Sequence, residues 1–116
     1  MTILIRNENI VREFTDALLL RHNDDISKII LFGSRAKGIF RPDSDYDLLI
    51  VLKNADRKIT DDIYDVATDF MLTYGVDISL KIYKENKYQA MEEAKTPFFI
   101  SVTKTGKELW SNKRAN

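Results

Sequence analysis

Residues 28–52 read KIILFGSRAKGIFRPDSDYDLLIVL, two apolar runs joined by a polar segment that contains glycine and proline. The first run, residues 28–32, is closed by Gly33 and Ser34 and predicts a short buried strand. The second run, residues 45–52, is apolar after its first residues and predicts another strand. The polar residues that could carry chemistry therefore lie between two expected strands or at their ends.

The remaining elements follow from apolar residues at helical spacing, from strict alternation, and from residues that begin or end helices. We expect a helix from Asn7, as N-cap, to about His22, a helix from the N-cap Thr60 to Gly75, an alternating strand at 76–82, a short helix at 87–94, a helix from Thr96-Pro97 to Gly106, and a last short strand at 109–110. This order predicts an α/β (α+β) fold, a small mixed β-sheet with helices packed on one face and the other face free for chemistry.

Length and charge narrow the functional classes. The chain has 116 residues, with 18 Lys+Arg against 18 Asp+Glu, and we expect one domain over residues 1–116. A net charge of zero argues against direct nucleic-acid binding, because phosphate neutralisation requires an excess of basic residues. The apolar residues at 1–5 are interrupted at once by Arg6, which fits neither a signal peptide nor a membrane span. We therefore expect a cytoplasmic protein that does not bind membranes.

The residue types present also limit the chemistry of any metal site. With no cysteine, the chain has no thiolate nucleophile and no Cys-ligated zinc. The single histidine, His22, cannot supply a multi-histidine site. Any metal ion must therefore be held by oxygen.

Asp45 and Asp47 stand at positions i and i+2 of the second expected strand. Their side chains leave the same face of the sheet, roughly 6.5 to 7 Å apart along the backbone. Mg²⁺ takes oxygen ligands, commonly one or two carboxylates together with substrate phosphates and water. The pair therefore offers a metal site, although a solvated acidic turn remains the alternative for the pair alone.

The turn before this strand has the outline of a phosphate cradle. Gly33 allows close approach of the backbone, Ser34 can donate a hydrogen bond to a phosphate oxygen, and Arg35 and Lys37 add positive charge. An ordinary glycine turn with a solvated basic face is the alternative interpretation. We expect these residues to bind a phosphate group if the turn is functional.

A third carboxylate, Asp77, belongs to the polar face of the alternating strand. If that strand lies beside the second one, Asp77 faces Asp45 and Asp47 across an interstrand gap of about 4.8 Å. Three such carboxylates can hold two Mg²⁺ ions about 3.5–4 Å apart, an arrangement suited to in-line phosphoryl or nucleotidyl displacement. Asp77 is then the candidate base.

Taken together, Gly33-Ser34, ten further residues, Asp45-Tyr46-Asp47 and a later Asp77 resemble the signature of polymerase-β-like nucleotidyltransferases. Residues 31–38 and 44–51 are similar to the minimal nucleotidyltransferase branch of that superfamily, and the similarity extends to residues 106–110. The resemblance implies that Gly33 and Ser34 bind the nucleotide phosphates. It also implies that Asp45 and Asp47 bind metal, while Asp77 completes the triad and assists deprotonation of the acceptor.

The resemblance further implies an enzyme that transfers AMP from ATP, with two Mg²⁺ ions, to a tyrosine hydroxyl of a HEPN-domain toxin encoded by the adjacent gene. The chain would then be an antitoxin that acts by AMPylation, alone or as a homodimer or hetero-oligomer. A 116-residue chain fits this role, because it leaves little room for a separate acceptor-binding domain. Two alternatives remain open at this stage: a non-catalytic antitoxin that masks its partner by binding, and a nucleotidyltransferase for small molecules, similar to aminoglycoside-modifying enzymes.

Overall fold

The computed structural model describes residues 6–33, 35–36, 45–54 and 56–112. Its elements are α1 (Arg6–His22), β1 (Ile26–Phe32), β2 (Tyr46–Leu52), α2 (Arg57–Tyr74), β3 (Ile78–Lys84), α3 (Glu85–Ala94), α4 (Pro97–Thr105) and β4 (Lys107–Ser111). The strands form one sheet in the order β3-β2-β1-β4. β1 runs antiparallel to β2 and β4, whereas β3 runs parallel to β2, so the predicted mixed sheet is confirmed.

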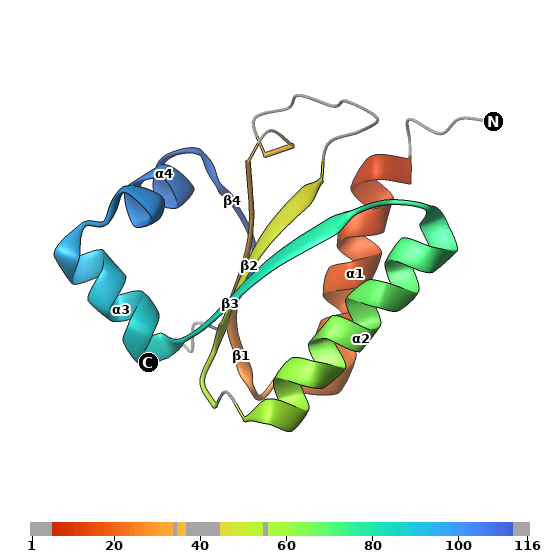
Figure 1. Ribbon diagram of the computed structural model, residues 1–116, viewed down its shortest axis with the longest axis horizontal. Helices are drawn as coiled ribbons and strands as arrows, with labels where there is room; N and C mark the ends of the chain where they lie inside the picture. Colours follow the sequence, from red (N-terminus) through yellow and green to blue (C-terminus); the bar gives the residue numbers. More distant parts are fainter. Residues whose placement is uncertain (1–5, 34, 37–44, 55, 113–116) are drawn as a thin grey trace.

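Helices α1 and α2 cover one face of the sheet (Figure 1). Their apolar sides meet alternate residues of the strands in the larger core cluster. Phe14 of α1 and Ile63 of α2 are fully buried there, together with Leu48 and Ile50 of β2. This packing makes the pair of long helices and the two central strands one continuous hydrophobic core.

Helices α3 and α4 lie on the opposite side of the sheet (Figure 1), so the prediction that all helices share one face is wrong. Val102 of α4 packs there with Ile30, Leu49 and Val51 in a second core cluster. The physical reason lies in β2, where residues 48–52 are all buried. A strand that is apolar at consecutive positions has to be covered on both faces, because successive side chains point in opposite directions.

The helix caps agree with the sequence analysis at α4 and differ at α2. Thr96 accepts a hydrogen bond from the Phe99 N–H at 3.2 Å, and Pro97 occupies the first helical position, as predicted. Helix α2 begins earlier than expected, because Asp56 and not Thr60 is the N-cap. The Asp56 carboxylate accepts from the Ile59 N–H at 3.0 Å, leaving Thr60 inside the first turn.

The remaining boundaries differ by small shifts. Asn7 lies inside α1, which begins at Arg6, so Asn7 is not its N-cap. β1 begins two residues earlier than expected and β3 two residues later. Among the described residues, none of the helices combines the length and the apolar composition that a membrane span requires.

Candidate active site

The three predicted acidic residues lie at the same end of the sheet, where β2 and β3 both begin. Asp45 directly precedes β2, Asp47 is its second residue, and Asp77 directly precedes β3. The backbone N–H of Tyr46 donates to the Asp77 carbonyl oxygen at 2.9 Å. Because Tyr46 is paired with Ile78 in the parallel register, Asp45 and Asp77 each stand one residue before a paired position.

The alternation of side chains places these aspartates on the face away from α1 and α2. Tyr46 and Ile78 both belong to the core beneath α1 and α2. Their neighbours in the chain, Asp45, Asp47 and Asp77, therefore leave the sheet toward the opposite face. The predicted acidic cluster thus lies on the side that carries α3 and α4, at the end where β2 begins, but its three carboxylates do not form a group that could hold a metal ion together.

Gly33 brings the end of β1 against one of these carboxylates. Phe32, the last residue of β1, is paired with Asp47, and Gly33 follows in a left-handed conformation with φ of 78°. A Cβ atom added at Gly33 would stand 2.3 Å from the Asp47 Oδ2 atom. Only glycine therefore lets the Asp47 carboxylate lie directly against the backbone of this turn.

The electrostatic environment of Asp47 disfavours its charged form. Partial burial raises the pKa of the Asp47 carboxyl above its ordinary value, and the nearby negative charge of Asp45 raises it further. The positive charge of Lys81 lowers the pKa and so opposes the rise. A cation bound beside Asp47 would stabilise the charged carboxylate, and so offset both the cost of its burial and its repulsion from Asp45.

The donor set of Asp45 and Asp47 suits a hard divalent cation. Among the described residues, no group of three or more histidine, aspartate or glutamate side chains is arranged to hold a metal ion. Mg²⁺ is commonly bound by one or two carboxylates, with substrate phosphates and water completing its shell. The two electrostatically coupled aspartates meet that requirement, while the role of Asp77 as a third ligand stays a prediction.

The predicted phosphate-binding residues are only partly described. Ser34 and Lys37 lie outside the described residues, whereas Gly33 contacts the acidic cluster as shown above. Arg35 is buried, with 7% of its surface exposed, and its guanidinium carbon lies 4.1 Å from the centre of the Tyr46 ring. Burial raises the pKa of the Tyr46 hydroxyl, and the positive charge of Arg35 opposes that rise.

Lys81 is a site residue that the sequence analysis missed. It belongs to β3 and is paired with Leu49, two residues beyond Asp47 on the same face. The signal was present in the alternation of the strand, because Asp77 and Lys81 share its polar face. The sequence pattern does not show, however, that β2 and β3 pair in parallel, and without that pairing Lys81 cannot be placed beside Asp47.

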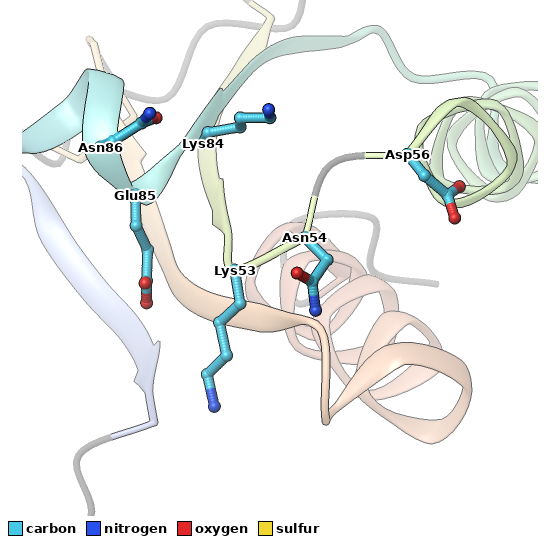
Figure 2. Close-up of a pocket in the computed structure, with 6 residues that line it drawn as sticks. All are labelled: Lys53, Asn54, Asp56, Lys84, Glu85 and Asn86. Atoms are coloured by element: carbon cyan, nitrogen blue, oxygen red, sulfur yellow. The ribbon is translucent and has the colours of Figure 1, made fainter.

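A separate pocket of about 460 Å³ lies at the other end of the sheet. Figure 2 shows side chains from the end of β2, the junction of β3 with α3, and the beginning of α2. Its lining residues are Lys53, Asn54, Asp56, Lys84, Glu85 and Asn86. None of the predicted catalytic or nucleotide-binding residues lines this pocket, so it is distinct from the acidic cluster.

A glycine turn held against paired carboxylates on a mixed sheet is the arrangement expected of an enzyme that handles phosphates with a divalent metal. Comparison with known proteins gives the family. Residues 17–115 match the family described as "Polymerase beta, Nucleotidyltransferase", and the chain belongs to it. Members of this nucleotidyltransferase family generally use a nucleoside triphosphate, typically ATP, together with a divalent metal ion.

One relative is a Methanocaldococcus jannaschii protein named "Putative protein adenylyltransferase MJ0604". It is 33% identical over 106 residues, which are 91% of this chain and all of the relative. A second M. jannaschii protein with the same type of name, MJ0141, is 33% identical over 101 residues, or 86% of this chain and 95% of its own.

Solved structures confirm the fold. One described as a toxin–antitoxin with AMP-PNP matches with a TM-score of 0.59 and 19% identity, over 88% of this chain and 74% of its own. Another is a Shewanella oneidensis complex of a tri-AMPylated HEPN toxin with an MNT antitoxin. It matches with a TM-score of 0.50 and 16% identity, over 87% of this chain and 70% of its own.

Proposed function

We propose that this chain is a metal-dependent protein adenylyltransferase that transfers AMP from ATP to a hydroxyl group of a partner protein. The observation that carries the proposal is the contact between the Gly33 turn and the Asp47 carboxylate. This contact brings a backbone suited to phosphates beside a carboxylate pair suited to a cation. The likeness to relatives named as protein adenylyltransferases, over 91% of the chain in one case, supports AMP as the transferred group.

Asp45 and Asp47 are the proposed ligands of Mg²⁺, and Asp77 is the proposed third carboxylate of a two-ion site. When bound, the metal ions neutralise charge on the triphosphate and on the attacking oxygen. Gly33 and Ser34 are the proposed phosphate-binding residues, and Lys37 is a further predicted nucleotide-binding residue. Lys81 adds positive charge on the same face of β3 and limits the repulsion between the carboxylates before the substrate arrives.

In the proposed reaction, the acceptor oxygen forms a bond to the α-phosphorus of ATP. The bond between that phosphorus and the bridging oxygen to the β-phosphate breaks, and pyrophosphate leaves. The proton of the acceptor hydroxyl passes to a base, for which Asp77 is the candidate. The products are an AMP ester of the acceptor and pyrophosphate, so atoms and charges balance without another reactant.

The proposed acceptor is a tyrosine of a HEPN-domain toxin encoded beside this chain, which would make the chain its antitoxin. Two lines support this choice of partner. The fold is similar to that of a chain in the complex of an MNT antitoxin with a tri-AMPylated HEPN toxin. It is also similar to a toxin–antitoxin structure that contains AMP-PNP.

The test combines this chain with the product of the adjacent gene, Mg²⁺ and ATP labelled at the α-phosphate. Wild-type protein should transfer label to the partner, and Asp47→Asn should abolish transfer while the fold remains intact. Asp69→Asn, at an exposed position of α2, is the matched control and should transfer label like wild type. Absence of label on a genuine HEPN partner would refute protein adenylylation.

Two other outcomes would replace the proposal. If Asp45→Asn/Asp47→Asn neutralises the toxin as well as wild type does, the chain acts by masking its partner. If label appears on an aminoglycoside or another small hydroxyl compound and not on the protein, the chain is a small-molecule nucleotidyltransferase.

A further inference from the structure

Arg35 and Gly33 contact two consecutive residues of β2 from opposite faces of the sheet. Tyr46 points into the core beneath α1 and α2, where the Arg35 guanidinium lies 4.1 Å from its ring centre. Asp47 points to the other face, where its carboxylate lies against Gly33. Gly33 and Arg35 therefore contact the beginning of β2 on its two sides.

The position of Arg35 does not suit direct binding of a phosphate. Its side chain is buried against Tyr46, which is itself 2% exposed and belongs to the core. The three aspartates leave the sheet on the opposite face, as established above. A phosphate held beside a metal on that face would be separated from the guanidinium by the backbone of β2.

A buried guanidinium over a buried tyrosine ring is a directional contact. The attraction between a cation and an aromatic face strengthens when both groups are desolvated. The planar guanidinium can stack on the ring, whereas a lysine ammonium at the same place cannot reproduce the stacking. Ala36, the next residue, also packs against the core on this side and adds to the anchoring of the segment.

We propose that Arg35 is a positioning residue, which fixes the Gly33 turn relative to Asp47 by stacking on Tyr46. The role is specific to the geometry of the site, and it replaces the expectation that Arg35 binds the nucleotide directly. Its catalytic consequence rests on the proposed function, because the positioned groups are the proposed nucleotide and metal ligands. The stacking itself and its effect on Gly33 do not depend on that function.

The test compares substitutions that separate charge from stacking. Arg35→Lys keeps the charge, Arg35→Gln removes it, Tyr46→Phe keeps the ring, and Tyr46→Leu removes it. Loss of the stack should lower kcat/KM for AMP transfer about tenfold or more in Arg35→Lys, Arg35→Gln and Tyr46→Leu, because misplacement near 1 Å is costly at a reacting centre. Tyr46→Phe should lose less activity than Tyr46→Leu, because its aromatic face remains.

The double variant Arg35→Lys/Tyr46→Leu decides whether the two residues act as a unit. Its kcat/KM should be within about threefold of the worse single variant, because contacting residues are not additive. Arg12→Lys, at an exposed position of α1, is the matched control and should behave like wild type. Assays are run below the lowest melting temperature of the set, with far-UV circular dichroism confirming the fold of each variant.

An activity-independent readout separates this proposal from the proposed function. The amide resonance of Gly33 in the nucleotide-free protein should shift in Arg35→Lys and Tyr46→Leu, and its hydrogen exchange should accelerate. Both changes should be smaller in Tyr46→Phe. If wild type transfers no AMP, the proposed function fails while this readout still decides the positioning role. If Tyr46→Leu does not fold, the comparison of Arg35→Lys with Arg35→Gln decides, since equal losses support stacking.

Two results would overturn the proposal. The first is an unmoved Gly33 amide in folded Arg35→Lys. The second is an active Arg35→Lys beside an inactive Arg35→Gln, with Tyr46→Leu unaffected, which would show that Arg35 acts through its charge on the nucleotide.

Discussion

Replacing Gly33 by alanine should greatly reduce AMP transfer while it lowers the stability of the fold only slightly. The new Cβ atom would stand 2.3 Å from the Asp47 Oδ2 atom and 3.2 Å from the Asp47 Cγ atom. Ordinary contact begins at 3.4 Å, so the carboxylate oxygen has to retreat by about 1.1 Å. A shift of about 1 Å in a reacting group can lower a rate about 100-fold, and we expect a loss of that order in AMP transfer.

The effect on stability should be smaller, because the Asp47 carboxylate can turn away from the added methyl group. What remains is the strain of a non-glycine residue at φ of 78°, which costs about 1–2 kcal/mol. Gly75→Ala is the matched control. Gly75 has φ of 67° and no atom within 4 Å of an added Cβ, so the same strain arises away from the site.

Both variants should therefore lose a similar free energy of unfolding in urea titrations, while only Gly33→Ala loses transfer of AMP from labelled ATP to the partner. Isothermal titration with Mg²⁺ and an ATP analogue gives a second measurement that needs no partner. Full activity of Gly33→Ala would refute the argument that Gly33 is needed for the placement of Asp47. Inactivity of Gly75→Ala would show that general destabilisation, and not the contact, explains the loss.

Three further results are expected. Asp47→Asn should raise the melting temperature at pH 7, because the pKa of Asp47 is raised in the folded state and its negative charge therefore opposes folding. The gain should vanish below the ordinary pKa of 3.8, where aspartate is protonated in both the folded and the unfolded state. A gain that persists at such a low pH would contradict this cause. Asp56→Ala should lower the free energy of unfolding by about 1 kcal/mol, because α2 loses its N-cap. AMP transfer by the folded protein should not change. An unchanged free energy of unfolding would contradict the role of Asp56 as the N-cap. Chelation of divalent ions by EDTA should stop AMP transfer, and Mg²⁺ should restore it; transfer in excess EDTA would contradict metal dependence.

The sheet and its acidic end could be predicted from local patterns. Two apolar runs fixed β1 and β2, and the positions of Asp45 and Asp47 two residues apart placed them on one face. The packing of helices on the second face of β2 could also be predicted, because residues 48–52 are apolar without interruption. Taken as a fully buried strand, that run predicts helices on both faces.

Other features depend on packing that a sequence pattern does not determine. Asp56 and Thr60 are both residue types favoured as N-caps, and the hydrogen bond to the Ile59 N–H decides between them. Arg35 in a glycine turn is typical of a phosphate site, yet here it stacks on Tyr46 in the core. That orientation depends on the register between distant segments, which local composition does not encode.

The central claim is that the Gly33 turn and the Asp45–Asp47 pair form one site for a nucleotide and a divalent metal. Isothermal titration calorimetry of wild type and Asp45→Asn/Asp47→Asn with a non-hydrolysable ATP analogue, with and without Mg²⁺, tests it most directly. We expect binding that is strengthened by Mg²⁺ in wild type and insensitive to Mg²⁺ in the double variant. Equal dependence on Mg²⁺ in both proteins, or no binding by wild type, would contradict it.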